Sequence, residues 1–352
     1  MYYMGIDIGG TKIAAGIVGE DYRILRRGAV PTPHGGSGEE LCDAAAALVL
    51  SLAQQADLTL TDFPWIGVGS PGYINAKAGV NLFSGNLGLR GVPMAAMLER
   101  RLDRRVFLCN DANAAAYGEA VAGAARGVQR SLTVTLGTGI GGGFVTQGYV
   151  DFPAGEVGHM VIAADGEPCT CGRRGCWEAY ASATALIRQT KAAMAAHPES
   201  ALWAFCGGDP NRVTGKTAFD AQAAGDLAAA QVTSRYIRYL AIGLANLMNM
   251  FEPQMVCIGG GISGQGETLF GPLRRLIREM VFVPEIADRS RIVPAALGAE
   301  AGIVGAALLG KWSVGKTDHL NLPTSEQPWP GLPDCDDSAK NWASAEGEGD
   351  SF

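Results

Sequence analysis

The sequence predicts an α/β fold with two lobes and a cleft between them. At 352 residues the chain is too long for a single core of ordinary size. Strand, loop and helix patterns alternate along it, as in an α/β domain. Residues 2–18 and 131–147 each contain a strand, a glycine-rich turn and a second strand, which indicates two related lobes that face one another.

The individual elements follow from turn signals and from the spacing of apolar residues. Besides the two hairpins, strands are expected at residues 65–69, 106–109 and 255–258. Helices are expected at residues 39–56, 112–122, 182–196, 222–250, 268–280 and 297–311. Residues 313–352 are rich in Pro, Ser, Gly and Asp and are expected to form a mobile acidic tail.

Charge and composition exclude several kinds of partner. The net charge is −7, but residues 313–352 hold eight of the acidic residues and only two lysines, so the body is nearly neutral. No run of Lys or Arg marks a surface for nucleic acid or an anionic membrane. The N-terminus lacks a basic signal-peptide region, and no apolar run could span a membrane. We therefore expect a cytoplasmic protein whose eight cysteines form no disulfide framework.

The first glycine turn carries groups suited to phosphate. The segment DIGGTK at residues 7–12 offers a carboxylate, backbone amides unshielded by side chains, a hydroxyl and a cation. Asp7 could hold Mg²⁺ through water. An ordinary glycine hairpin would show the same spacing, so this motif alone leaves both interpretations open.

The second glycine turn, GTGIGGG at residues 137–143, formally matches the dinucleotide fingerprint G-x-G-x-x-G. That fingerprint requires a helix at its third glycine, whereas residues 144–146 continue as strand. A hairpin that holds phosphate fits better, and a second such turn favours phosphate binding at the first as well. The segment TGKT at 214–217 resembles a Walker A ending, but Pro210 replaces the required glycine, so we expect a turn that starts a helix.

Asp111 stands in NDAN at residues 110–113, where a predicted strand meets a predicted helix. A lone aspartate at such a junction is usually an N-cap. It could instead act as a catalytic base, because a carboxylate within reach of a hydroxyl can accept its proton during phosphoryl transfer. That role requires both glycine turns to face Asp111.

A cluster of soft ligands follows the second hairpin. His159, Cys169, Cys171 and Cys176 suit tetrahedral Zn²⁺, although a buried histidine with three free thiols is the alternative. Four protein ligands leave no position for a water molecule, so the zinc would be structural. Folding around zinc would bring Glu156, His159 and Glu178 together, and carboxylates with an imidazole suit a polyhydroxylated ligand such as a sugar. If one ring nitrogen of His159 binds zinc, the other is fixed as a donor toward that ligand.

These motifs together resemble the ROK family of bacterial sugar kinases and repressors over residues 3–311. The matching segments are DIGGTK, NDAN, LGTGIGGG at 136–143, GEVGH at 155–159, CTCGRRGC at 169–176 with Glu178, and IGGG at 258–261. The resemblance implies an actin-like ATPase (ribonuclease H-like) fold. We expect a smaller lobe of residues 1–114 and 297–312 and a larger lobe of residues 115–296 that carries the zinc loop.

The resemblance also implies roles for single residues. Asp111 would be the general base, and Asp7 belongs to the nucleotide site. The ATP phosphates would be held by Gly9, Gly10, Thr11, Lys12, Thr138 and Gly139, and Gly260 and Gly261 would line the adenosine pocket. The sugar would be bound by Asn86, Asn110, Asp111, Glu156, His159 and Glu178, with zinc on His159, Cys169, Cys171 and Cys176. Asn86 lies in SGNLGLRG, where a serine and a glycine replace the family's usual neighbours.

Within the family, GVGSPGYIN and NLGLRGVP most resemble the glucokinase branch, which transfers the ATP γ-phosphoryl group to the 6-hydroxyl of glucose. Kinases of N-acetylglucosamine, N-acetylmannosamine, mannose or fructose share nearly every motif and remain alternatives. A non-catalytic sugar-sensing regulator is a further one, but such repressors carry a helix-turn-helix ahead of Asp7, where few residues precede it. A chaperone-type actin-like ATPase would not need the zinc cluster. The expected partners are a sugar and ATP, without nucleic acid or membrane, in a homodimer or homotetramer.

Overall fold

The computed structural model of the chain describes residues 1–33, 37–151 and 155–314. Its strands are β1 (Tyr3–Ile8), β2 (Lys12–Val18), β3 (Ile24–Pro31), β4 (Ile66–Ser70), β5 (Tyr73–Asn75), β6 (Val80–Ser84), β7 (Leu89–Val92), β8 (Val106–Asn110), β9 (Arg130–Leu136), β10 (Ile140–Thr146), β11 (Tyr149–Asp151), β12 (Met255–Gly259) and β13 (Arg291–Pro294). The α-helices are α1 (Gly38–Gln55), α2 (Met94–Leu102), α3 (Asp111–Val121), α4 (Glu178–Ala181), α5 (Ala183–Ala196), α6 (Leu202–Phe205), α7 (Thr217–Ala223), α8 (Leu227–Phe251), α9 (Glu267–Met280), α10 (Pro284–Arg289), α11 (Ala301–Ala307) and α12 (Leu309–Val314). Single 3₁₀ turns lie at Leu60–Asp62, Val157–His159, Pro210–Arg212, Gly261–Gln265 and Gly298–Glu300.

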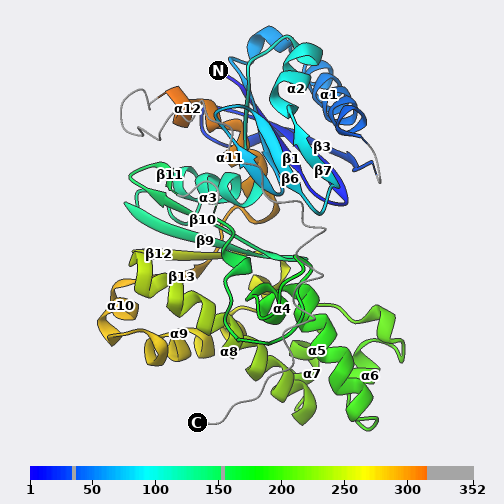
Figure 1. The fold of residues 1–352 in the computed structure, drawn as a ribbon, viewed down its shortest axis with the longest axis vertical. Coiled ribbons are helices and arrows are strands. Elements are labelled where there is room, and N and C mark those ends of the chain that lie inside the picture. Colours follow the sequence, from blue (N-terminus) through cyan, green and yellow to red (C-terminus); the bar gives the residue numbers. More distant parts are fainter. Residues whose placement is uncertain (34–36, 152–154, 315–352) are drawn as a thin grey trace, which may run out of the picture. The chain divides into compact units, whose positions relative to one another are not determined.

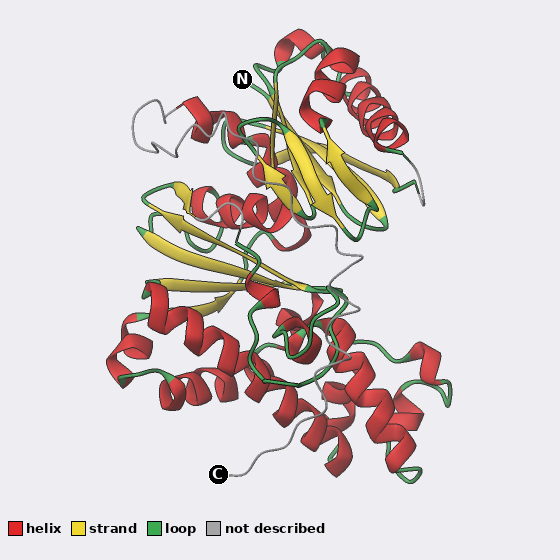
Figure 2. Cartoon of the chain, in the orientation of Figure 1, coloured by secondary structure: helices red, strands yellow, loops and turns green. Residues whose placement is uncertain are grey.

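Two five-stranded sheets have the same topology (Figure 2). The first has the order β3-β2-β1-β4-β8 and the second the order β11-β10-β9-β12-β13. In each, the first three strands in sequence form an antiparallel meander, and two later strands add in parallel beside its first strand. This repetition confirms the duplicated arrangement expected from the two glycine hairpins. Figure 1 shows the two sheets within the unit Met1–Trp312.

Helices α3 and α11 join the sheets through close backbone packing. α11 packs on α3, β1 and β4, while α3 also packs on β9 and β10 of the second sheet. A Cβ atom added to Gly305 of α11 would lie 1.7 Å from the carbonyl oxygen of Ala114 in α3, and one added to Gly67 of β4 would lie 1.7 Å from that of Ala306. The small residues of both helices therefore let their backbones meet.

Three expected elements differ from the structure. GTGIGGG is not all turn, because residues 140–143 belong to β10. The helix expected at 222–250 is divided into α7 and α8 at Gly225, whose φ of +91° cannot continue a helix, and Asp226 caps α8 through the amide of Ala229. The helix expected at 297–311 is also broken, since α11 ends at Ala307, where the Trp65 indole donates to its carbonyl oxygen at 2.9 Å.

Some of the other expectations agree with the structure, and others are not tested by it or concern residues that it does not describe. The TGKT segment precedes α7, as expected, and the sheet β5-β6-β7 had no counterpart in the sequence prediction. The seven cysteines of the described chain are free. Within that part of the chain, none of the helices combines the length and apolarity needed to cross a membrane. The lobe boundaries stay a prediction, and the tail expected at 313–352 lies, from residue 315 on, outside the described residues.

The contact between α3 and α11 predicts a large effect of one added methyl group. Gly305→Ala should lower the free energy of unfolding by about 3 kcal/mol, because its Cβ has no space beside the Ala114 carbonyl. Gly264→Ala is the matched control, since a Cβ there meets nothing within 4 Å. Urea unfolding of both variants measures the difference, and equal stability would contradict the described packing.

Candidate active site

Asp111 is the first residue of α3, directly after β8. Asn110 is the N-cap, and its side-chain oxygen accepts from the amides of Ala112 at 2.9 Å and Asn113 at 3.2 Å. The carboxylate of Asp111 also accepts from the Ala112 amide, at 2.9 Å. Burial raises the pKa of Asp111, against the hydrogen bonds from backbone amides that lower it. The interpretation of Asp111 as the N-cap of the helix is therefore wrong, because Asn110 caps α3.

Asp7, near the end of β1, lies close enough to Asp111 for their charges to interact. Burial, and next the charge of Asp111, raise the pKa of Asp7 to about 6, while Lys12 lowers it. Gly302 of α11 makes room for this carboxylate, because a Cβ there would lie 2.6 Å from Asp7 Oδ2. Two neighbouring carboxylates, one of which raises the pKa of the other, are a donor set that fits a hard divalent cation such as Mg²⁺.

Two hydrogen bonds hold the first glycine turn, one within it and one from Thr32. The amide of Gly9 donates to the carbonyl oxygen of Lys12 at 2.9 Å, and the hydroxyl of Thr32 donates to the carbonyl oxygen of Gly9 at 2.7 Å. Gly10, Thr11 and Lys12 are exposed. Asn86 is exposed beside this turn, with its Cβ 4.0 Å from the position of a Cβ on Gly10. The turn and Asn86 therefore belong to one surface.

The second glycine turn is ordered by Glu178 of α4. The amide of Ile140 donates to Glu178 Oε2 at 2.9 Å, and a Cβ on Gly139 would lie 2.0 Å from that oxygen. Thr138 is exposed at the tip of the turn. Gly260 lies against the end of β9, since a Cβ there would meet the Leu136 carbonyl oxygen at 2.1 Å. The turn and the IGGG segment are thus neighbours.

Glycines inside β10 bring two further segments to this strand. A Cβ on Gly141 would lie 2.7 Å from the Ala112 Cβ of α3, and one on Gly142 would lie 2.7 Å from Val157 Cγ2. Because alternate residues point to opposite faces, α3 packs on one face of β10 and Val157 packs on the other. The glycines expected to cradle phosphate therefore also place α3, which begins with Asp111, and the segment with Glu156 and His159.

The carboxylates of Glu156 and Glu178 complete a group with Asp111. Burial, followed by the charges of Asp111 and Glu178, raises the pKa of Glu156 to about 7, although the residue retains solvent exposure. Glu178 Oε1 accepts from the hydroxyl of Thr170 at 3.3 Å. The structure thus collects three carboxyl groups from three different segments, as a ligand rich in hydroxyl groups requires.

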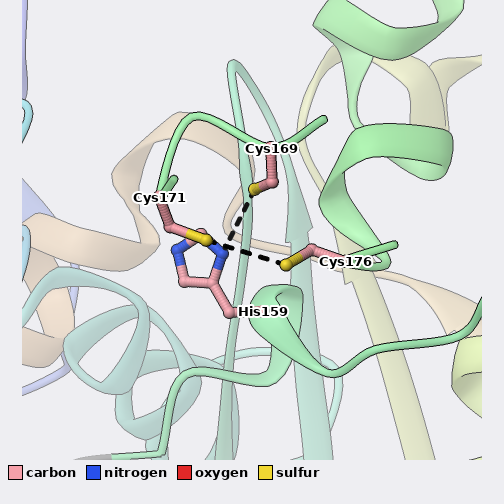
Figure 3. A group of neighbouring side chains, drawn as sticks. All are labelled: His159, Cys169, Cys171 and Cys176. Atoms are coloured by element: carbon pink, nitrogen blue, oxygen red, sulfur yellow. Dashed lines mark hydrogen bonds between the residues drawn. The ribbon is translucent and has the colours of Figure 1, made fainter. Parts of the chain in front are cut away.

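His159, Cys169, Cys171 and Cys176 form a compact cluster in which all four ligand atoms lie within 4.8 Å of one another (Figure 3). His159 Nδ1 is 3.6 Å from Cys169 Sγ, and Cys171 Sγ is 3.7 Å from Cys176 Sγ. In a tetrahedral zinc site with bonds of about 2.0 Å to nitrogen and 2.3 Å to sulfur, neighbouring ligand atoms are roughly 3.5–3.8 Å apart. The residues therefore fit zinc in both chemistry and spacing.

The loop that carries the cysteines contains a tight turn and is anchored directly after its last cysteine. Gly172 has a φ of +85° and donates to the Cys169 carbonyl oxygen at 3.0 Å, which makes the tight turn between Cys169 and Cys171. After Cys176, the fully buried Trp177 donates from its indole to the Tyr239 carbonyl oxygen of α8 at 2.9 Å. The loop thus joins the sugar-binding candidates to the longest helix of the second half.

Cys171 is the exposed member of the cluster. Burial would raise the pKa of its thiol, but hydrogen bonds from the backbone and side chain of Arg173, and those with Cys169 and Cys176, lower it to about 7. A thiolate near neutral pH is the form that binds metal.

Comparison with known proteins agrees with this arrangement. The model of the ROK family matches residues 3–312. The chain belongs to the ROK family. It is 38% identical over 317 residues to a glucokinase of Thermotoga maritima, covering 89% of this chain and 98% of the relative. It is 31% identical to an N-acetyl-D-glucosamine kinase of Yersinia pseudotuberculosis, covering 88% and 98%. A solved ROK family glucokinase from Streptomyces griseus, in complex with glucose and AMPPNP, superposes with a TM-score of 0.78 at 37% identity, covering 88% and 99%.

Membership of the ROK family and the actin-like fold are thus as the motifs predicted. Sequence reasoning missed three residues that support the site: Thr170 beside Glu178, Thr32 beside the first turn, and Gly302 below Asp7. Thr170 could have been found, because it is the hydroxyl residue between two candidate zinc ligands. Thr32 and Gly302 carry no local signal, since only the folded chain brings them to residues 9 and 7.

The zinc cluster predicts about one zinc ion per chain in freshly purified protein. Cys176→Ser should lose most of this zinc and lower the melting temperature, because the loop loses a buried ligand. Elemental analysis and thermal unfolding measure both effects. Cys206→Ala, a buried cysteine outside the cluster, is the control and should keep its zinc. Far less than one zinc in the wild-type protein would count against the site.

The raised pKa of Asp7 predicts a stability cost that depends on pH. The folded protein binds this proton more tightly than the unfolded chain, so the wild type loses stability as pH rises from about 4 to about 6. Asp7→Asn removes this loss and should be more stable than the wild type at pH 8, by up to about 3 kcal/mol. At pH 4 the difference should shrink.

Urea unfolding without added divalent cations or nucleotide measures this difference across the pH range. The exposed Asp57, changed to Asn, serves as the control. A gain for Asp7→Asn that is independent of pH, or one shared by the control, would contradict the assigned electrostatics.

Proposed function

We propose that this chain is an ATP-dependent glucokinase that transfers the γ-phosphoryl group of ATP to the 6-hydroxyl of glucose. The observation that carries the proposal is the group around Asp111: a half-buried carboxylate at the start of α3, beside Asp7 of the DIGGTK segment and Glu156 near the zinc ligands. The glucokinase names of the relatives and the glucose and AMPPNP of the Streptomyces griseus structure support the same assignment.

In this proposal the sugar is held by side chains from both halves of the chain. Asn86 and Asn110 bind it from the first half, and Glu156, His159 and Glu178 bind it from the second. Because His159 turns Nδ1 toward Cys169, its Nε2 is left to donate to a sugar hydroxyl. Glu178 has one oxygen bound to the Ile140 amide, and its other oxygen, held by Thr170, is the one to accept from the sugar.

The nucleotide is assigned to the glycine segments. Its phosphates lie against the amides of Gly9 and Gly10, with Thr11, Lys12, Thr138 and Gly139, and its adenosine lies beside Gly260 and Gly261. Mg²⁺, when bound near Asp7, neutralises phosphate charge during transfer. Zinc on His159, Cys169, Cys171 and Cys176 orders the loop and is structural.

Asp111 accepts the proton of the 6-hydroxyl as the oxygen attacks the γ-phosphorus. Burial raises its pKa and so increases its basicity, while Asn110 fixes the start of α3 and the direction of the carboxylate. Glu156, with its pKa near 7, accepts best from the sugar when ionised, so the apparent affinity for sugar rises with pH through about 7.

A kinase of N-acetylglucosamine is the second candidate, because a relative with that name is 31% identical over most of its length. Kinases of mannose, fructose or N-acetylmannosamine share the same motifs. A cytoplasmic homodimer or homotetramer remains the expected assembly and location.

Asp111→Asn should lower kcat for glucose-dependent ADP formation by about 10²–10⁴-fold, since the amide cannot take the proton. Glucose binding, measured by calorimetry, should be largely kept. Asp57→Asn is the control for an exposed aspartate and should be fully active.

Glucose, mannose, fructose, N-acetylglucosamine and N-acetylmannosamine tested side by side identify the substrate. If none of them stimulates ATP turnover, the kinase proposal fails. If N-acetylglucosamine gives the highest kcat/KM, the second candidate replaces the first.

A further inference from the structure

Glu119, two turns after Asp111 in α3, is a charged residue with no exposed surface. Carboxylates are almost never fully buried unless they are paired. Among the described residues Glu119 makes no ion pair with a Lys or Arg. Its side chain instead accepts hydrogen bonds from three backbone amides, so these amides and not a salt bridge compensate for its burial.

The three amides belong to two different segments. Glu119 Oε2 accepts from Ala124 at 2.8 Å and from Ala296 at 3.0 Å, and Oε1 accepts from Leu297 at 2.8 Å. The backbone carbonyl of Glu119 also accepts from Gly123 at 3.1 Å and Ala125 at 3.0 Å. Gly123 is needed here, because a Cβ would lie 2.1 Å from Glu119 Oε2.

These two segments are the connections between the two sheets. Residues 122–129 lead from α3 to β9, the first strand of the second sheet. Residues 295–297 lead from β13 of the second sheet back toward α11, which packs on β1 and β4 of the first. Within the described chain these are the two passages from one sheet to the other, and one carboxylate holds both.

From this we infer that Glu119 is a positioning residue that clamps both connections at one point and so fixes α3, and Asp111 with it, relative to the second sheet. This inference rests on the proposed kinase function for its kinetic consequences. Of the residues proposed to bind the sugar, Asn110 and Asp111 would move with α3, whereas Glu156, His159 and Glu178 lie outside the two segments that Glu119 holds. Loss of the clamp should therefore misplace the base more than it weakens sugar binding.

Glutamine at position 119 retains the size of the side chain but has only one acceptor oxygen, so at least one amide loses its partner. Glu119→Gln should lower kcat at least about tenfold while KM for glucose changes less than about threefold, at a temperature where the variant is folded. Gly123→Ala should reproduce this effect by displacing the same carboxylate. The double variant should be no worse than the stronger single one, because both changes break one clamp.

Glu199→Gln, at an exposed glutamate paired with His197, is the control and should keep the wild-type kcat. Three results would each overturn the inference. The first is an unchanged kcat in Glu119→Gln, and the second is a rise in KM for glucose as large, in fold-change, as the fall in kcat. The third is additive effects of the two changes in the double variant.

Hydrogen exchange of the wild-type protein tests the clamp without relying on activity or on a variant that folds. The amides of Ala124, Ala296 and Leu297 should exchange slowly both without ligand and with glucose, as a fixed point does. Exchange as fast as in exposed loops would overturn the inference. If the protein shows no sugar-dependent ATP turnover but these amides are protected, the proposed function fails and the clamp remains.

Discussion

The structure depends on contact between backbones where side chains are missing. α3 lies against α11 at Gly118 and Gly305 and against β10 at Gly141 and Gly143, with space for no Cβ atom at these points. Side chains of ordinary size would separate these elements by several ångströms. Asp111 at the start of α3, the glycine turn before β10 and Asp7 of β1 would then no longer lie close together.

This close packing also determines the electrostatics of the site. Asp7, Asp111 and Glu156 come from separate segments. Burial raises the pKa of each, and the charge of Asp111 raises the pKa of Asp7 and Glu156 further. The resting protein therefore holds several carboxyl groups in a costly environment. In the proposed function, a divalent cation and the hydroxyl donors of a sugar would relieve that cost, so that stability given up in the free protein would contribute to ligand binding.

Local signals were sufficient for part of this arrangement. The two hairpins, the strand before Asp111 and the cluster of His159 with three cysteines follow from turn residues, periodicity and residue spacing, and the structure has them where the sequence predicts them. The glycines of β10 were expected to be turn because glycine disfavours strands, and the helix that requires them there cannot be seen locally. Glu119 gave no signal, since its partners Ala296 and Leu297 lie 177 and 178 residues away.

The position of α11 has a consequence for synthesis on the ribosome. α11 covers β1 and β4, which are made first, yet residues 301–307 are among the last of the described chain to be made. Until they emerge, the glycines of β1 and β4 and the apolar residues around them have no covering helix, although the second sheet can already form. In the nascent protein this face of the first sheet is therefore covered late, which leaves it open to aggregation during translation.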